Sequence, residues 1–257
     1  MTGEELKNRL RQGGRVYGTM FVVGRPGAGD ERLEAMGLDY VIVDNEHSPF
    51  SRAERAAWCR RLRDAGLVPF VRVPIPASHY VTMALDGGAQ GILAPYVERV
   101  EQVREVVAAA KYLPLKGEAV DRAVAEGVFP SDATRDHLAE RNKNNVLAIG
   151  IESVAAMERL DELLSVPGVD AAFVGPNDLT IQLGVPADYQ HPSYLEAVSH
   201  IHATCQAKGV PLVIHFFDYA MADPWIAEGV RLVLFGSDRA GIGDAMRADF
   251  DHLRGLP

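Results

Sequence analysis

The chain is poor in cysteine and has no long apolar run. Its two cysteines, Cys59 and Cys205, lie far apart among 257 residues, which excludes a disulfide framework and a cysteine-rich metal site and fits a reducing compartment. No stretch approaches the ~18 apolar residues that span a bilayer, and the first residues lack the apolar core of a signal peptide. The sequence therefore predicts a cytoplasmic protein with no membrane partner.

Positive charge is also scarce. The chain has 26 Lys and Arg residues against 35 Asp and Glu residues, a formal net charge of −9, which argues against nucleic acid as a partner. None of its few lysines lies on a strand that we predict below, so an amine buried to form a Schiff base is not expected. Apolar residues make up 47% of the chain, enough for a large core. Composition alone does not choose between one α/β barrel and two small domains.

Short β-branched runs alternate with segments of helical periodicity, which is typical of β-α units around a parallel sheet. The eight predicted strands are Arg15–Gly24, Tyr40–Asp44, Val68–Val73, Gly91–Val97, Val146–Glu152, Val169–Gly175, Pro211–Phe217 and Arg231–Asp238. The predicted helices include Ser51–Ala65, Arg99–Tyr112, Ser153–Val166, Tyr194–Lys208 and Gly241–Arg254. Eight units at this length favour one (β/α)₈ TIM barrel that spans residues 1–257.

One long segment, Leu113–Asn145, separates the fourth and fifth units and contains an extra predicted helix, Asp132–Asn142. Functional loops of barrels gather on the top face, where the strands end. We therefore expect this insertion to project from the top face as a lid or a subunit contact.

Polar side chains follow several predicted strands at the point where each strand ends. The second predicted strand ends in the residues Asp44 to His47, and Arg72 lies at the end of the third. The fifth ends in Glu152, and the sixth ends in the segment Gly175 to Asp178. The carboxyl ends of barrel strands meet at one mouth, so these groups should form one site.

Glu152 and Asp178 would place two carboxylates on neighbouring strands. With no histidine or cysteine cluster beside them, they suit a hard cation such as Mg²⁺ or Mn²⁺ that keeps several waters. The alternative is that each carboxylate caps the helix that follows. This alternative is stronger for Asp178 than for Glu152, because Ser153 is the natural cap beside Glu152.

Two further residues point to acid–base and anion chemistry. His47 lies three residues after Asp44, so the carboxylate could hold one ring nitrogen and leave the other as a base, although a purely structural histidine is the alternative. Arg72 interrupts an apolar strand with a permanent charge that must meet an anion. That anion is either a substrate oxygen or a structural carboxylate such as Asp44 or Asp86.

In this order, the motifs of the chain resemble those of the HpcH/HpaI aldolase family, the metal-dependent pyruvate aldolases of the phosphoenolpyruvate/pyruvate barrel superfamily. The motifs are Asp44-Asn45-Glu46-His47-Ser48-Pro49, Val71-Arg72-Val73-Pro74, Leu85-Asp86-Gly87-Gly88-Ala89, Ile149-Gly150-Ile151-Glu152-Ser153 and Val174-Gly175-Pro176-Asn177-Asp178-Leu179.

The resemblance implies a role for each residue of the site. A divalent metal, Mg²⁺ or Mn²⁺ with Co²⁺ as a third option, would bind Glu152 and Asp178 and hold a 2-oxo acid. Arg72 would stabilise the enolate oxygen, and the pair of His47 and Asp44 would transfer protons. The substrate carboxylate would bind the backbone of the sixth-strand motif, at residues Gly175, Pro176 and Asn177.

The resemblance also implies a homo-oligomer. Members of the family form trimers or hexamers with exchanged C-terminal helices, in which the residue that matches Asp86 lies near the site of an adjacent subunit.

Three positions depart from the family pattern. Gly150 stands where a glutamine is usual, Lys116 lies in Lys116-Gly117-Glu118 where an Arg-Gly loop is usual, and His215 ends the seventh strand where small or amide residues are usual. We hypothesise that His215 and Lys116 reshape the mouth for a different, anionic acceptor.

Together these features predict a metal-dependent carbon–carbon lyase. It would cleave or form a 4-hydroxy-2-oxo acid through a pyruvate-type enolate, with a small 2-oxo acid and an aldehyde as its partners. One rival is oxaloacetate-type decarboxylation or cleavage of an acyl-CoA ester at the same site. A rival of another class is a barrel that binds a carboxylate without catalysis.

Overall fold

The computed structural model describes residues 1–24, 33 and 36–240. Eight parallel strands close into a barrel in chain order, β1 to β8, with β8 paired to β1. The strands are β1 (Val16–Phe21), β2 (Tyr40–Asp44), β3 (Val68–Arg72), β4 (Gly91–Ala94), β5 (Val146–Ile151), β6 (Ala171–Val174), β7 (Leu212–Phe216) and β8 (Leu232–Ser237). All eight predicted strands are confirmed, and the fold is the predicted (β/α)₈ barrel.

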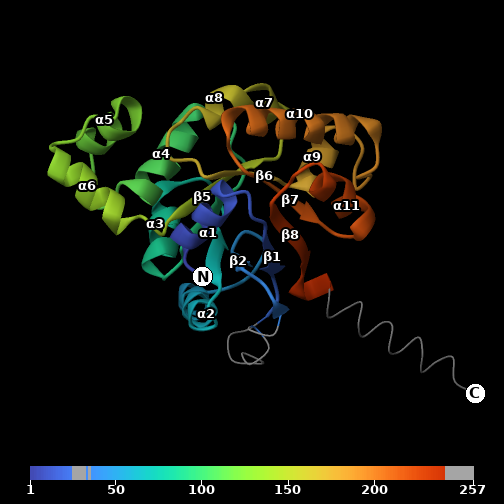
Figure 1. Ribbon diagram of the computed structural model, residues 1–257, viewed down its shortest axis with the longest axis horizontal. Coiled ribbons are helices and arrows are strands. Elements are labelled where there is room, and N and C mark those ends of the chain that lie inside the picture. The colour runs from blue at the N-terminus through green and yellow to red at the C-terminus, as the bar shows by residue number, and fades with distance from the viewer. Residues whose placement is uncertain (25–32, 34–35, 241–257) are drawn as a thin grey trace, which may run out of the picture.

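Helices surround the barrel and connect most of its strands (Figure 1). They are α1 (Gly3–Arg11), α2 (Arg52–Asp64), α3 (Ser78–Asp86), α4 (Val100–Lys111), α5 (Glu118–Glu126), α6 (Asp132–Arg141), α7 (Val154–Glu158), α8 (Leu160–Leu164), α9 (Pro176–Gln182), α10 (Pro192–Lys208) and α11 (Tyr219–Ala227). None of the described helices is both long and apolar enough to cross a membrane.

Local sequence explains where several helices begin and end. Ser51 accepts a hydrogen bond from the Glu54 backbone N–H, and the Glu54 side chain accepts one from the Ser51 N–H, so this capping box starts α2. Ser153 caps α7 in the simpler way, by accepting from Ala156 N–H. Gly209 ends α10 with φ 66°, a left-handed conformation that glycine adopts without steric cost.

The predicted helix Ser153–Val166 is instead two short helices, α7 and α8. Arg159 separates them with φ −104° and ψ 11°, outside the helical region. The predicted helix Gly241–Arg254 lies outside the described residues.

Two apolar layers meet at the barrel wall. One fills the barrel interior with alternate strand residues such as Ile42, Phe70, Ala148 and Val213, and the other packs the outer strand faces against the helices. Leu6 of α1 belongs to the interior layer and is fully buried, so α1 closes the end where the strands begin. Because strand side chains alternate, the interior positions continue upward to the opposite end, which is the open mouth.

The insertion between β4 and β5 leaves the barrel at the end opposite to the predicted one. α4 runs back from the mouth, and Lys111 at its end donates through Nζ to Asp170, which directly precedes β6. Asn142, after α6, donates to the Lys111 carbonyl at 3.0 Å. From this base α5 and α6 extend outward beyond α4 (Figure 1). The expectation of a top-face lid was wrong, because the extra residues follow a helix and not a strand.

Candidate active site

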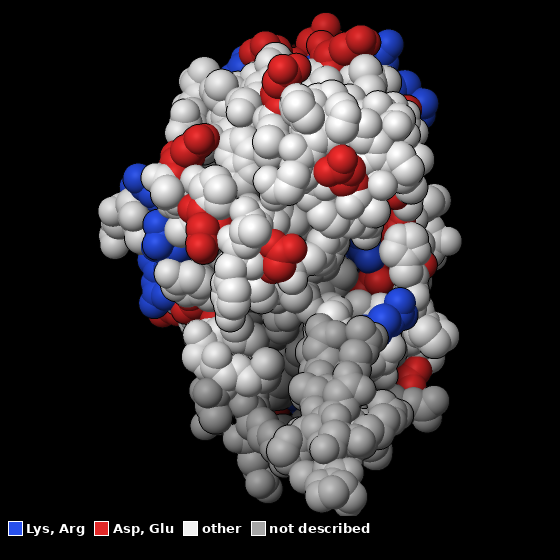
Figure 2. All heavy atoms as spheres, turned by 90° about the vertical axis from the view of Figure 1, so that its right-hand side faces the viewer, with Lys and Arg blue, Asp and Glu red and all other residues white. Residues whose placement is uncertain are grey.

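The interior side-chain positions of several strands end in polar groups at the mouth. Ile42 lies in the barrel interior, and Asp44 follows two residues later on the same face. Arg72 follows Phe70 and His215 follows Val213 in the same way, and Glu152 comes directly after β5. The chain thus gathers these groups from β2, β3, β5 and β7. Figure 2, which views the right-hand side of Figure 1, shows a recess in which acidic and basic atoms lie together.

Arg72 is held by two carboxylates. Its Nε donates to Asp44 Oδ1 at 2.8 Å, and its Nη1 lies 3.1 Å from Glu46 Oε2. All three side chains are at least nine-tenths buried. Burial opposes ionisation of Asp44, but the hydrogen bond and charge of Arg72 lower the pKa of its carboxyl below the usual value. Arg72 Nη2 has no hydrogen bond or ion pair with a described residue, so this end of the guanidinium can still donate to a ligand.

The predicted pairing of His47 with Asp44 takes a different form. Only the His47 backbone N–H points at Asp44, 3.5 Å from Oδ1, whereas the ring Nε2 lies 3.6 Å from Glu46 Oε1. The His47 side chain is 55% exposed, at the rim of the site. Asp44 therefore orients Arg72, and the carboxylate beside the imidazole is that of Glu46.

Glu152 is the most deeply buried acid of the mouth after Asp44, with 3% of its surface exposed. Its Oε2 accepts a hydrogen bond from the Tyr96 backbone N–H at 2.9 Å. Burial, with added repulsion from Asp178 and Glu46, raises the pKa of Glu152 to about 7 despite that hydrogen bond and the charge of Arg72. A cation at this carboxylate would offset the cost of its charge.

Asp178 lies beside Glu152 and does not act as a cap. The N-cap of α9 is Gly175, and Asp178 sits in the first turn of the helix without a hydrogen bond to any described residue. Ser153 caps α7, so Glu152 is also free of that role. Both carboxylates line one cavity of about 120 Å³ together with Tyr96 and Glu98. The capping alternative thus explains neither residue.

Two glycines leave room for the Glu152 side chain. A Cβ at Gly175 would lie 2.6 Å from Glu152 Oε1, and one at Gly150 would lie 3.0 Å from Glu152 Cδ and 3.0 Å from the Pro95 Cα. A larger residue at position 175 must displace the carboxylate, and one at position 150 would crowd both the carboxylate and the Pro95 backbone. Gly150, which departs from the usual family residue, is therefore part of the packing that sets where Glu152 lies.

The segment 175–178 after β6, which we expect to bind the substrate carboxylate, differs along its length in burial and in backbone N–H donors. Gly175 and Pro176 are buried, whereas Asn177 is exposed. Pro176 has no N–H, so donors for a bound carboxylate can come only from Gly175, Asn177 and Asp178.

His215 lies at the mouth but is not positioned as a cation. Its Nε2 lies 2.9 Å from the Gly236 carbonyl oxygen, so this nitrogen carries the proton and donates. Burial lowers the pKa of His215 to about 4. His215 therefore lies at the mouth as hypothesised, but as an uncharged side chain, which does not favour an anionic acceptor through its charge.

Two other predicted residues lie away from this mouth. Asp86 is the exposed last residue of α3, five residues before β4 begins, and Lys116 is exposed just beyond α4. Lys116 lines a separate cavity of about 690 Å³ among α3, α4 and α5. Lys116 does not line the cavity that holds Glu152 and Asp178, so the structure gives no support to the idea that it reshapes the mouth of its own barrel.

Sequence reasoning missed two residues of the site, Glu46 and Tyr96. Glu46 belongs to the motif after the second strand, and its only signal in the sequence is that it lies two residues beyond the strand end at Asp44. Tyr96 follows β4 with φ 54°, a left-handed conformation uncommon outside glycine. Burial and a hydrogen-bonding interaction with Glu46 raise the pKa of its hydroxyl.

No group of three or more His, Cys, Asp and Glu side chains within the described ranges is arranged to hold a metal. The mouth offers two carboxylates, Glu152 and Asp178. A cation held there would complete its shell with water and substrate oxygens, which is how Mg²⁺ is commonly bound.

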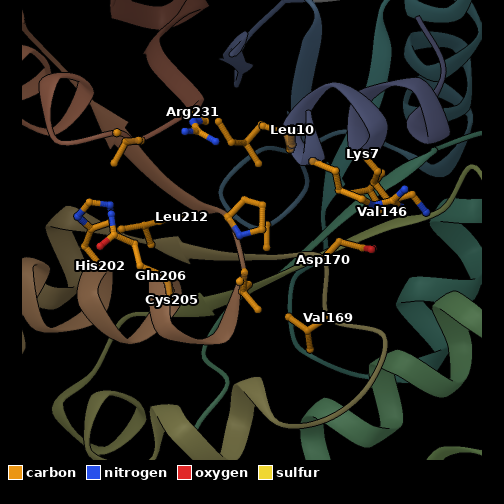
Figure 3. Close-up of a pocket in the computed structure, with 18 of the residues that line it drawn as sticks. Lys7, Leu10, Val146, Val169, Asp170, His202, Cys205, Gln206, Leu212 and Arg231 are labelled. Atoms are coloured by element: carbon orange, nitrogen blue, oxygen red, sulfur yellow. The ribbon is translucent and has the colours of Figure 1, made fainter. Parts of the chain in front are cut away.

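A third cavity, of about 640 Å³, lies at the opposite end of the barrel. It is lined by Lys7 and Leu10 of α1 and by Asp170, Cys205 and Arg231 (Figure 3). It is separated from the mouth by the packed barrel interior, so it does not belong to the site described above.

Comparison with known proteins agrees with this geometry. The profile of the HpcH/HpaI aldolase/citrate lyase family matches residues 18–244. The chain is 32% identical over 202 residues to a 2-keto-3-deoxy-L-rhamnonate aldolase of Klebsiella pneumoniae, covering 79% of this chain and 75% of that protein. It is 32% identical over 211 residues to a 5-keto-4-deoxy-D-glucarate aldolase of Salmonella paratyphi A, covering 81% and 80%.

The chain is also similar in fold and sequence to solved structures. An HpcH/HpaI aldolase from Desulfitobacterium hafniense DCB-2 superposes with a TM-score of 0.85 at 30% identity, covering 98% of this chain and 97% of that one. The citrate synthase SbnG superposes with a TM-score of 0.81 at 26% identity, covering 97% of each.

Proposed function

The chain belongs to the HpcH/HpaI aldolase/citrate lyase family, and from this premise we propose that it is a divalent-metal-dependent aldolase. It would cleave a 4-hydroxy-2-oxo acid to pyruvate and an aldehyde, and catalyse the reverse addition. The observation that carries the proposal is the pair of Glu152 and Asp178, two carboxylates that cap no helix and line one cavity.

The residues present fit a hard divalent cation. Glu152 is buried beside two other acids, Asp178 and Glu46, and the buried Glu46 Oε1 and Asp44 Oδ2 have no hydrogen-bond donor among the described residues. Such an excess of oxygen acceptors is typical of sites for Mg²⁺ or Mn²⁺, with Co²⁺ as a third option. A cation held by Glu152 and Asp178 would lower the cost of negative charge on the keto oxygen of the substrate.

Arg72 would stabilise the same charge from the other side. Asp44 and Glu46 hold its guanidinium in place, and the unpaired Nη2 supplies donors for an oxygen that becomes negative during the reaction. Backbone N–H groups of Gly175 and Asn177 would bind the substrate carboxylate. The fixed position of Arg72 means that no side chain has to reorganise when charge develops.

Proton transfer falls to His47. In the direction of cleavage, the base takes the proton of the 4-hydroxyl group and the bond between C3 and C4 breaks. The bonding electrons form the enolate, and a proton added at C3 gives pyruvate. The exposed position of the His47 ring allows it to exchange that proton with solvent.

The test uses purified protein freed of metal with a chelator. Adding Mg²⁺ or Mn²⁺ should restore pyruvate release from a 4-hydroxy-2-oxo acid and deuterium exchange into the methyl group of pyruvate. Full activity in excess chelator would remove the metal role. A lack of methyl exchange under all metals would favour the non-catalytic binding protein.

A second candidate function is decarboxylation of oxaloacetate, which would pass through the same enolate. The likeness to the citrate synthase SbnG, at 26% identity, is the reason to test a reaction other than aldol cleavage. If oxaloacetate is decarboxylated with Mn²⁺ and 4-hydroxy-2-oxo acids are not cleaved, the decarboxylase is the better description.

We also infer a homo-oligomer, a trimer or a hexamer. This is supported by the exposed position of Asp86, away from the mouth of its own barrel, where a second copy can reach it. Light scattering with size-exclusion chromatography measures the state, and a monomer at assay concentration would contradict it.

A further inference from the structure

An aromatic row lies beside the candidate site. His215 follows Val213 on the inner face of β7, Phe217 comes directly after the strand, and the centroids of their rings are 4.8 Å apart. The Phe217 ring is in turn 5.3 Å from Tyr189, in the connection between α9 and α10. Tyr189 donates its hydroxyl hydrogen bond to Asn177 Oδ1, one residue before Asp178. The row therefore runs from the barrel mouth to the first turn of α9.

This row is uncharged at neutral pH. Because His215 donates from Nε2 to the Gly236 carbonyl, its other nitrogen, Nδ1, is a bare acceptor with no described hydrogen-bond partner. Phe217 cannot ionise, and it keeps 37% of its surface exposed. Exposed aromatic carbon beside a buried polar site is available for contact with the apolar part of a ligand.

The charges of described residues that act on His215 come from Arg72 and Asp44. They form an ion pair with each other, and the remaining Arg72 Nη2 is the donor for the oxygen that becomes negative in the reaction, so Arg72 does not also bind a second, distant carboxylate. A carboxylate pressed against the row would lose hydration, and none of the three ring side chains carries a positive charge that would compensate, which is unfavourable. An uncharged ring would lose little and gain aromatic contacts.

We propose that the aldehyde half of the substrate carries an uncharged aromatic or apolar substituent, which packs against His215, Phe217 and Tyr189. This inference rests on the proposed aldolase function and names the substrate class of the same site. The proposed substrate differs from a glucarate-type substrate, which the name of one relative gives, because a glucarate skeleton has a carboxylate at each end.

The chemistry of the addition is unchanged by this choice. Pyruvate loses a methyl proton to the base, its C3 forms a bond to the aldehyde carbon, and the aldehyde oxygen gains a proton to become the 4-hydroxyl group. Only the substituent on the aldehyde carbon contacts the row, so the row acts on acceptor selection.

The experiment compares two acceptors with pyruvate and Mn²⁺. Phenylacetaldehyde carries the ring, and succinic semialdehyde is a chain of similar length that ends in a carboxylate. We expect kcat/KM for phenylacetaldehyde to be at least about 10-fold higher, the size of effect that one well-packed group gives. Equal values, or a preference for succinic semialdehyde, would overturn the inference.

Variants locate the preference on the row. Phe217→Ala should reduce the ratio of the two kcat/KM values several-fold, mainly through KM for phenylacetaldehyde, and Phe217→Arg should reverse it. Tyr219→Ala is the matched control, because Tyr219 is 75% exposed and stacks on Phe235 outside the row. A ratio that is the same in Phe217→Ala and Phe217→Arg as in the unmodified protein would also overturn the inference.

Methyl deuterium exchange separates the two levels of the argument. Exchange with no preference for the ring overturns the substrate class and leaves the aldolase proposal standing. Absence of exchange overturns the aldolase proposal and the substrate class with it.

Discussion

The Nε atom of Arg72 lies 2.8 Å from Oδ1 of Asp44, and both side chains are buried at the mouth of the barrel. The two residues occupy paired positions on β2 and β3, so the parallel register sets this contact. Asp44 therefore fixes the position of the Arg72 guanidinium, while the His47 side chain lies at the exposed rim of the site.

This relationship predicts different effects at Asp44 and His47. Asp44→Ala leaves a buried guanidinium short of a partner and should cost about 3–5 kcal/mol of unfolding free energy. His47→Ala removes an exposed ring and should change stability by less than about 0.5 kcal/mol while lowering kcat. Urea unfolding and steady-state kinetics measure both. Equal losses of stability would contradict the assignment.

Arg72→Lys should lose most of the turnover and keep the fold. A lysine can pair with Asp44 or Glu46 but cannot also present a planar fork to a substrate oxygen. We expect kcat to fall by about 100-fold or more, the range seen when one donor to a developing oxyanion is removed. Circular dichroism checks the fold. A kcat within threefold of the unmodified protein would show that Arg72 is structural only.

The metal role of Glu152 and Asp178 can be tested without activity. Glu152→Gln and Asp178→Asn should each abolish or strongly weaken Mn²⁺ binding by isothermal titration calorimetry, because a neutral amide replaces a charged ligand. Glu158→Gln is the matched control, since Glu158 is an exposed glutamate on α7. Mn²⁺ binding that survives in both variants would place the cation elsewhere.

The glycine at position 175 should be intolerant of a methyl group. In Gly175→Ala the new Cβ would lie 2.6 Å from Glu152 Oε1, so the carboxylate must move. The backbone at this position has φ −87°, which alanine adopts freely, so the effect is steric and local. We expect weaker Mn²⁺ binding and at least about a 10-fold loss of kcat, in line with the effect of small misplacements on catalysis. Unchanged Mn²⁺ affinity would count against the position of Glu152.

His215 should make stability depend on pH. Burial lowers its pKa in the folded protein to about 4, below the unfolded value near 6.5, so the unfolded chain binds the proton more readily between these values. Its contribution is therefore fully present above pH 6.5 and is lost as pH falls toward 4. Unfolding at several pH values should show a shallower loss for His215→Gln than for the unmodified protein. His79→Gln, at an exposed position on α3, is the control, and a loss that becomes equally shallow in this variant would contradict the assignment to His215.

The strands and the ends of the strands followed from local patterns. A buried parallel strand needs a short β-branched run, and a polar residue directly after it can only lie at the mouth. This is why Asp44, Arg72, Glu152 and Asp178 could be grouped from the sequence. Lys116 could not be placed in the same way, because it follows a helix and not a strand.

The partners of individual side chains could be identified only from the folded chain. Asp44 and His47 are close in sequence, which favoured a pairing, yet the register between β2 and β3 gives the Asp44 carboxylate to Arg72. The charge of His215 depends on a carbonyl 21 residues away on β8 and on its burial, and neither is visible in the local sequence. Tyr96 belongs to the site through its backbone, whose N–H donates to Glu152, a contact between residues 56 positions apart in the sequence.

The sequence by itself determined the barrel, its eight strands and the end of the barrel at which the polar groups meet, because hydrophobic period and strand polarity are local properties. The tertiary structure alone decided which acid holds Arg72, that Glu152 and Asp178 share a cavity, and that His215, Phe217 and Tyr189 form one uncharged row. These contacts join strands far apart along the chain, and their distances depend on register and packing, which no single segment contains.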